Sequence, residues 1–344
     1  MLKANPLLQW EWVDDEDGPI GVLLESETGE RFPVTDPAYL FAISIALEER
    51  DPAELRDRLV EDVDVDRRCA DQIVSELRER ELLVPYDDDR FDRAQQWFER
   101  DWRLALYCHL AARRQTAPTA SGNGSESTAA IETATPVADR PSISLPSPAP
   151  LGKESLKSVL LKRHTSRAFH GQIDREAIST LLYHMFAPER QLAENDGASR
   201  EPAPFAAAAT YPFNVYSVVL DGEDLSEGVY RYLPEDHSLE RVQSGVSADI
   251  IETLAIGQSW VSDAPVTFLF TADMIGAQHY HSHPQAFRSL FTNLAATAHR
   301  LILAATTLGM KNFLSPAVRD NEVEELLEIE PLREVALYLV SVGR

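Results

Sequence analysis

The chain has 344 residues, of which 44% are hydrophobic, and its 56 acidic and 32 basic side chains give a net charge of −24. This length accommodates roughly two or three domains, each able to bury a hydrophobic core of its own. A surface this acidic repels a phosphate backbone, so nucleic acid is not an expected partner.

The cysteine count and the apolar runs set the expected compartment. Cys69 and Cys108 lie far apart and form no Cys-x-x-Cys motif, so neither a disulfide framework nor a cysteine zinc site is expected. No run of about 18 uncharged apolar residues occurs, and the first residues lack the apolar segment of a secretory signal. We therefore expect a cytoplasmic protein without a membrane partner.

Residues 1–113 predict a small winged-helix-like module. QWEWV and GVLLESETGERFPV alternate in polarity around Thr28-Gly29, which predicts a β-hairpin. Two amphipathic patterns follow, the first with Asp51 as its N-cap, and the strand-like LLVPY comes after them. Acidic residues surround the would-be recognition helix and disfavour DNA, so a peptide or protein is the expected partner. These acids are Asp62, Asp64, Asp66, Glu76, Glu79 and Glu81.

The end of this module and the following segment differ sharply in composition. Phe98, Trp102, Leu106 and Leu110 recur every four residues and predict one continuous helical stripe, either core or docking surface. Residues 114–153 are rich in Ala, Ser, Thr and Pro and lack aromatic residues, so they predict a disordered linker. The linker would separate the first module from a second domain at 154–344.

The second domain alternates helical and strand patterns. The expected elements are a helix at 174–186 capped by Asp174, a strand at 214–222, a hairpin at 228–242, a buried strand at 264–273, a long helix at 285–310 and a last strand at 334–344. Gly309 marks the end of the long helix. The predicted class is α+β, with a mixed central sheet wrapped by helices.

The segment KRHTSRAFHG concentrates positive charge in this acidic chain. Its residues Arg163, His164, Thr165 and Arg167 offer guanidinium and hydroxyl donors, which bind phosphate well. A solvated surface turn paired with neighbouring acids is the alternative. Composition alone leaves both interpretations open.

The order of motifs resembles that of a known family. The Arg-His-Thr-x-Arg segment followed by IDREAISTLLY resembles the opening of the FMN-dependent nitroreductase superfamily. PFAAAATYPFNVYSVV is similar to the Pro-Ser-Ala-Gly-Ala-Leu-Tyr-Pro stretch of its SagB-type dehydrogenases, and IGQSW, the long helix and the last strand match in order. The resemblance is strong over 154–344, moderate over 90–113 and faint over 1–89.

The resemblance implies a set of FMN contacts. Phosphate and ribityl contacts would come from Arg163, His164, Thr165 and Arg167. The isoalloxazine ring would lie against Ala206, Ala207, Ala208 and Tyr211, where Ala206 and Ala208 replace the family's serine and glycine. Further contacts would come from Gln258, Gly309, Lys311 and Arg344.

The segment AQHYHSHPQAF is a second candidate for chemistry. His279, His281 and His283 alternate, so on a strand they would share one face and could bind zinc. The resemblance instead implies a catalytic pair, because His279-Tyr280 stands where SagB-type oxidases carry Lys-Tyr. The histidine would take a proton and the tyrosine would orient or relay it. A pocket rim lined by the two side chains remains open, and no metal is expected.

The resemblance also implies a reaction. The expected activity is oxidation of thiazoline or oxazoline rings to azoles in a ribosomally made peptide. Flavin-dependent reduction of dehydroalanine or dehydrobutyrine, a generic NAD(P)H-dependent nitro or quinone reductase, and a flavin-free peptide-binding scaffold are the alternatives. Expected partners are a peptide substrate, a cyclodehydratase or another maturation enzyme, and a second copy in a homodimer.

Overall fold

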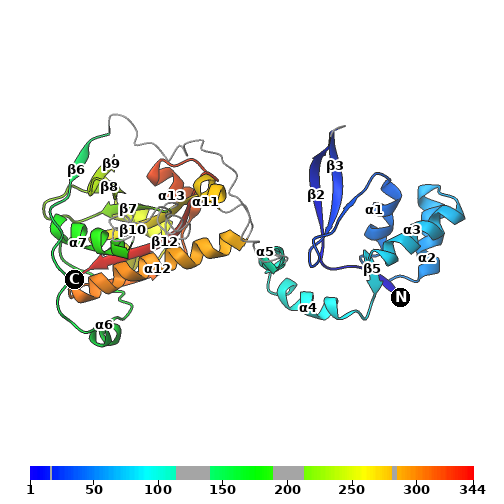
Figure 1. Ribbon diagram of the computed structural model, residues 1–344, viewed down its shortest axis with the longest axis horizontal. Coiled ribbons are helices and arrows are strands. Elements are labelled where there is room, and N and C mark those ends of the chain that lie inside the picture. Colours follow the sequence, from blue (N-terminus) through cyan, green and yellow to red (C-terminus); the bar gives the residue numbers. More distant parts are fainter. Residues whose placement is uncertain (16–17, 114–139, 189–212, 281–284) are drawn as a thin grey trace, which may run out of the picture. The chain divides into compact units, whose positions relative to one another are not determined.

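The computed structural model describes residues 1–15, 18–113, 140–188, 213–280 and 285–344. The chain divides into two compact units, residues 1–122 and 123–344, and each has its own hydrophobic core (Figure 1). None of the helices in the described ranges combines the length and hydropathy needed to cross a bilayer.

The first unit begins with two small antiparallel sheets. One contains β2 (Leu8–Asp15), β3 (Gly18–Glu25) and β4 (Arg31–Pro33), and the other pairs β1 (Leu2–Ala4) with β5 (Leu83–Pro85). The predicted hairpin is present as β3 and β4, which the Thr28-Gly29 turn joins. The buried Glu25 carboxylate fixes this turn by accepting hydrogen bonds from the Thr28 backbone N at 2.7 Å and hydroxyl at 2.8 Å.

Three helices complete the core of this unit, and each begins at an aspartate cap. They are α1 (Pro37–Ile45), α2 (Pro52–Val63) and α3 (Arg67–Glu79). The predicted Asp51 cap is confirmed, because its side chain accepts a hydrogen bond from Ala53 N at 2.8 Å. Leu55 and Leu59 of α2 pack with Ile73 and Leu77 of α3, and all four are buried.

The prediction of one continuous helix through Phe98 and Leu110 is wrong. The structure has two helices, α4 (Asp89–Phe98) and α5 (Arg103–Arg113). Asp101 adopts a left-handed φ of 59°, and Trp102 N donates back to Trp97 O at 2.8 Å, which is the geometry of a helix C-terminus. Trp102 consequently leaves the stripe and is 60% exposed, whereas Leu106 and Leu110 are buried against Leu7.

The second unit is built on a seven-stranded sheet with the order β11-β12-β10-β7-β8-β9-β6. The strands are β6 (Ser142–Ser144), β7 (Phe213–Val219), β8 (Gly228–Leu233), β9 (Ser238–Ser244), β10 (Val266–Asp273), β11 (Lys311–Ser315) and β12 (Glu334–Gly343). Neighbouring strands are antiparallel, and parallel pairing occurs in two isolated bridges, Thr165–Asn312 and Ile173–Gly222. The predicted strands and the 228–242 hairpin are confirmed.

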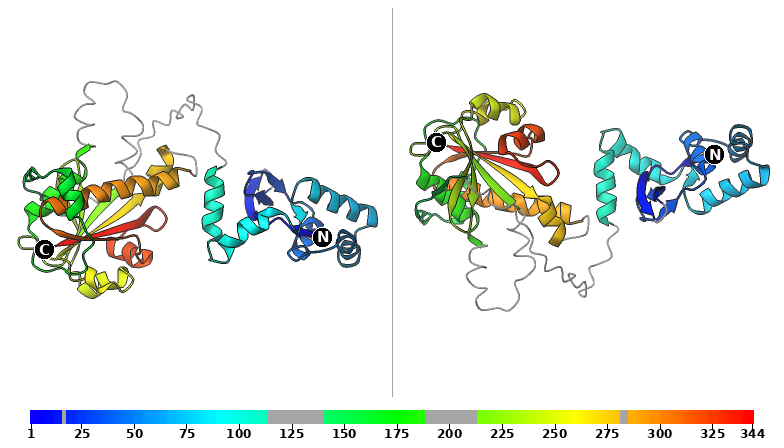
Figure 2. Two further views of the ribbon diagram at one scale, coloured as in Figure 1. Left: turned by 90° about the horizontal axis from the view of Figure 1, so that it is seen from below. Right: turned by 90° about the horizontal axis from the view of Figure 1, so that it is seen from above.

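Helices cover both faces of this sheet (Figure 2). One face packs against α7 (Arg175–Met185) and α12 (Gln285–Thr307), and the other against α10 (Ala248–Leu254) and α13 (Asp320–Leu327). Asp174 caps α7 as predicted, accepting from Ala177 N at 2.7 Å. Gly309 follows α12 with a φ of +73°, a conformation that suits glycine at a helix end.

The part of the expected linker that the structure describes, residues 140–153, packs on the second unit. Residues 142–144 form β6 on β9, and Leu145 is buried in the core. Ser179 Oγ donates to Pro146 O at 2.6 Å, while Ala149 N donates to Thr180 Oγ1 at 2.9 Å. His184 Nε2 donates to Ala149 O at 3.0 Å. These long-range backbone contacts order a segment whose composition alone predicted disorder.

The first unit should lose stability at high pH through Tyr39. Its hydrogen bond to the Glu76 carboxylate, with burial, raises the pKa of the phenol to about 12. This contribution is complete below pH ~10, the ordinary tyrosine value, and disappears as pH rises through about 12. Four of the five tryptophans precede residue 114, so urea unfolding followed by tryptophan fluorescence reports this unit.

The Tyr39→Phe variant should unfold at lower urea concentration at pH 8 and show a flatter decline above pH 10. The exposed Tyr86 gives the matched control, since Tyr86→Phe should keep the wild-type pH dependence. An unchanged decline in Tyr39→Phe would contradict the assignment.

Candidate functional site

The basic segment lies along one edge of the seven-stranded sheet and is held there by its backbone. Thr165 forms a parallel bridge with Asn312 of β11, and Ser166 N donates to Asn312 O at 2.8 Å. His170 N donates to Arg344 O at 3.0 Å, and Arg344 N donates back to His170 O at 3.3 Å. The segment therefore runs beside the start of β11 and the end of β12.

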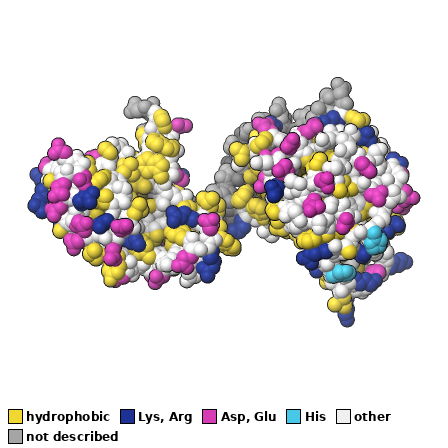
Figure 3. Space-filling view, turned by 180° about the vertical axis from the view of Figure 1, so that it is seen from behind, with side chains coloured by type: hydrophobic (Ala, Val, Ile, Leu, Met, Phe, Trp, Pro, Cys, Tyr) yellow, Lys and Arg dark blue, Asp and Glu magenta, His cyan; other side chains and the backbone are white. Residues whose placement is uncertain are grey.

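This arrangement brings most of the predicted phosphate-side residues to one end of the sheet. Lys311 pairs with Gly343, so it lies next to the chain's last residue, and Gly309 forms the turn from α12 into β11. We call Arg163, Thr165, Arg167, Lys311 and Arg344 the basic edge. In Figure 3, Lys, Arg and His side chains gather on the lower right of this unit, around the lobe that carries α6 (Leu156–Lys162).

The cations of the basic edge have no acidic partner among the described residues. Arg163 is half-buried, Arg167 and Arg344 are exposed, and none of them forms an ion pair within the described ranges. By contrast, Arg140 and Arg175 of the same unit pair with carboxylates at 2.7 and 2.8 Å. Unpaired guanidinium groups at one edge of an acidic protein suit an anionic ligand.

Two aromatic rings hold the guanidinium of Arg167. Its central carbon lies 5.3 Å from the Trp260 ring centroid and 5.9 Å from that of Phe313. Trp260 belongs to the short turn η1 (Ser259–Val261), and Phe313 belongs to β11. Gln258, the predicted contact in this turn, donates its Nε2 to Ala255 O at 2.8 Å and so caps α10. The sequence reasoning did not select either ring.

Asn312 adds an acceptor beneath the basic segment. The residue is 2% exposed, and its Nδ2 donates to Thr306 Oγ1 at 3.2 Å. Its Oδ1 is buried and has no hydrogen-bond donor among the parts of the chain that are described. A buried acceptor without a donor is costly, so this position suits a ligand that carries hydroxyl groups.

The predicted catalytic pair lies at the opposite end of the sheet. His279 and Tyr280 are the last residues of α11 (Met274–Tyr280), which starts where β10 ends. The sequence predicted that His279, His281 and His283 would share one face if they lay on a strand. His279 lies on a helix, so that strand is not present at His279. His281 and His283 lie outside the described residues, and no metal-binding cluster of His, Cys, Asp or Glu occurs among those described.

The predicted ring-side contacts cannot be placed relative to α11, because they fall between two described ranges. Ala206, Ala207, Ala208 and Tyr211 lie outside the described residues. The described chain resumes at Phe213, which pairs with Ala272 beside the start of α11. The eight residues of β10 span roughly 25 Å, which separates this end from the basic edge. Figure 1 shows α11 and the C-terminus at opposite ends of α12.

A buried carboxylate anchors the strands below α11. Glu334 is 7% exposed, and its Oε1 accepts hydrogen bonds from Asn214 Nδ2 at 2.9 Å, Tyr216 OH at 2.9 Å and Thr271 Oγ1. Burial and the nearby Glu334 charge raise the pKa of the Tyr216 phenol. Met274 N also donates to the carbonyl that precedes Glu334, at 2.8 Å. The start of α11 is thereby joined to β12.

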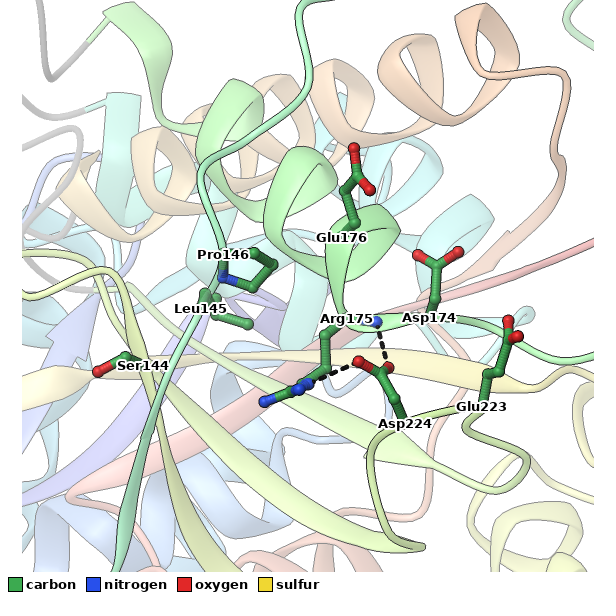
Figure 4. A pocket seen from close by; sticks show the side chains of 8 residues that line it. All are labelled: Ser144, Leu145, Pro146, Asp174, Arg175, Glu176, Glu223 and Asp224. Carbon is green, nitrogen blue, oxygen red and sulfur yellow. Dashed lines mark hydrogen bonds and ion pairs between the residues drawn. The ribbon is translucent and has the colours of Figure 1, made fainter.

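A separate cavity of about 540 Å³ lies where α7 begins (Figure 4). Its lining is Ser144, Leu145, Pro146, Asp174, Arg175, Glu176, Glu223 and Asp224. Asp224 accepts hydrogen bonds from the Arg175 backbone N and Nε, both at 2.8 Å, which lower the pKa of its carboxyl against the effect of burial. Because carboxylates dominate this lining, it does not suit a phosphate.

Comparison with known proteins gives a family match over most of the second unit. Residues 160–344, more than half of the chain, match the Nitroreductase family. The chain belongs to this family. The nitroreductase match includes the basic segment, the whole of α12 and the last strand.

Relatives of this nitroreductase-family chain differ in how much of it they match. Trifolitoxin operon protein TfxC of Rhizobium leguminosarum bv. trifolii is 28% identical over 370 residues, covering 100% of both chains. MJ1384 of Methanocaldococcus jannaschii, whose name assigns it to the nitroreductases, is 28% identical over 190 residues, 55% of this chain and 90% of that protein.

A nitroreductase-like crystal structure from Anabaena variabilis shares the fold, with a TM-score of 0.56 and 21% identity over 71% of this chain. The present chain spans about half of the length of the Anabaena protein, since the match covers 47% of that protein.

Removing the Glu334 carboxylate should destabilise the second unit. Glu334→Ala leaves the half-buried Asn214 and the buried Tyr216 and Thr271 without their acceptor and should lower the free energy of unfolding by about 3 kcal/mol. Glu334→Gln keeps an acceptor oxygen and should cost less. Urea unfolding followed by circular dichroism measures both values, and equal losses would exclude the hydrogen-bond account.

Proposed function

We propose that this chain is a SagB-type, FMN-dependent oxidoreductase that oxidises thiazoline or oxazoline rings to azoles in a ribosomally made peptide. The observation that carries the proposal is the set of unpaired cations at the basic edge, inside the region that matches the nitroreductase family. Clustered guanidinium and ammonium groups without carboxylate partners among the described residues attract an anion such as a phosphate.

The residues of the basic edge fit FMN. Arg163, Arg167 and Lys311 supply positive charge for a phosphate, and Thr165 adds a hydroxyl donor. Asn312 Oδ1, which lacks a donor in its buried position, fits a ribityl hydroxyl. When bound, FMN supplies a two-electron hydride acceptor next to the substrate.

The separation of the two ends supports a homodimer. The cations of the basic edge and the His279-Tyr280 pair lie at opposite ends of β10, roughly 25 Å apart. A single chain would therefore not bring both groups to one flavin. A second copy, packed in the opposite sense, would bring the α11 end of one chain to the basic edge of the other. The exposed Phe287 and Phe291 on α12, whose rings are 4.8 Å apart, offer apolar surface for that contact.

Ring oxidation removes a hydride and a proton from adjacent atoms of the azoline. FMN, when bound, would supply the hydride acceptor, and His279 would take the proton, since imidazole has an ordinary pKa of about 6.5. Tyr280 orients or relays that proton. The azole product has one more ring double bond than the azoline.

The full-length relative supports a peptide substrate. TfxC, by its name a protein of the trifolitoxin operon, matches the first unit as well as the second, whereas MJ1384 matches 55% of the chain. We assign the winged-helix-like unit of residues 1–113 to binding the peptide or a partner enzyme. A cyclodehydratase is the partner whose product this reaction would consume, and the cytoplasm is the compartment where ribosomal peptides are made.

Arg163→Ala should weaken FMN binding about tenfold or more, because a charge-assisted hydrogen bond to phosphate is lost. The dissociation constant is measured by quenching of flavin fluorescence on titration into protein freed of cofactor. Arg140→Ala is the matched control, since it removes an arginine whose partner is Glu328. Equal affinity in all three proteins would remove Arg163 from the site, and no FMN binding by the wild type would refute the proposed function.

His279→Ala should lower turnover about 100-fold with flavin still bound, and Tyr280→Phe up to about tenfold. The assay uses a thiazoline-containing peptide and detects loss of two hydrogen atoms by mass spectrometry. A dehydroalanine peptide with reduced cofactor, run in parallel, tests the reverse reaction. Normal turnover in both variants would exclude the pair from proton transfer, and reduction without oxidation would reverse the assigned direction.

A further inference from the structure

Arg167 is held by aromatic rings, without an acidic partner. Trp260 and Phe313, which we call the aromatic platform, lie edge to face with their centroids 5.6 Å apart and an interplanar angle of 74°. Phe313 is 4% exposed and belongs to the core beneath α10 and α13, so the platform has a rigid base. The guanidinium of Arg167 lies within 6 Å of both centroids, which is the distance of a cation–π contact.

This way of holding an arginine keeps its charge available. A carboxylate would orient the guanidinium and cancel its charge, whereas a ring face contacts the guanidinium plane and leaves the in-plane N–H donors unused. Arg167 is exposed and makes no ion pair with any described residue, so those donors remain free for an anion. The platform therefore orients a cation that the acidic surface would otherwise neutralise.

The indole N–H is not what makes the tryptophan useful here. Trp260 Nε1 is buried and has no acceptor among the described residues, which costs stability. The benefit of the side chain must come from its ring surface, which contacts Phe313 and Arg167. Gln258, two residues earlier, uses its amide on the end of α10.

We propose that Trp260 is a positioning residue that holds Arg167 toward the FMN phosphate. The proposal rests on the proposed function and adds a residue to it. Trp260 acts through Arg167, so its contribution to FMN affinity should depend on the arginine being present.

A double-mutant cycle on FMN affinity tests this dependence. Trp260→Leu should raise the FMN dissociation constant about two- to fivefold when Arg167 is present, the range that an exposed cation–π contact supplies. In an Arg167→Met background the same change should have no further effect, because the cation is gone. Trp260→Phe keeps a ring face and removes the unpaired N–H. Unlike Trp260→Leu, it should retain near wild-type FMN affinity and a folded protein.

Trp102→Leu provides the matched control, since it removes an exposed tryptophan from the other unit and should leave FMN affinity unchanged. Equal losses in both Arg167 backgrounds would mean a purely structural role for Trp260 and would overturn the inference, as would wild-type affinity in Trp260→Leu. Either result leaves the proposed function standing if wild-type protein binds FMN. If the wild-type protein does not bind FMN, both the role of Trp260 and the proposed function are refuted.

Discussion

Backbone pairing between the basic segment and the sheet edge is the contact on which the site depends. Ser166 and His170 donate their amide N–H groups to carbonyls of Asn312 and Arg344, so main-chain atoms fix the segment. The side chains of Arg163 and Arg167 form no ion pair with a described residue, so their donors are available to a ligand. In a solvated turn, the alternative interpretation, the basic side chains would pair with neighbouring acids. Lys162 does pair with Glu154 at 2.6 Å, whereas Arg163 and Arg167 form no ion pair with a described residue.

The α12 helix and the strands beside it then determine where chemistry can occur. Their length separates the cations at Gly309–Lys311 from the end of α11, while the Glu334 cluster ties the start of α11 to β12. The proposed FMN contacts and the proposed proton acceptor therefore lie at two ends of one framework.

Features that depend on neighbouring residues could be predicted from the sequence, whereas contacts between distant residues could not. The caps at Asp51 and Asp174 and the glycine after α12 act within three residues, so periodicity and residue type sufficed. The left-handed Asp101 that divides α4 from α5 left no trace in the four-residue spacing. Family resemblance supplied the arginines, but Glu334 reaches Asn214 across 120 positions, and the contact of Trp260 with Arg167 depends on the fold.

The distance between the two ends of β10 has a genetic consequence. If each flavin takes its cations from one chain and its proton acceptor from the other, two inactive alleles can complement each other. A copy lacking Arg163 and a copy lacking His279 would assemble into a mixed dimer in which one site has lost both groups and the other has lost neither. Half of the sites in such dimers would work, although neither parent protein does.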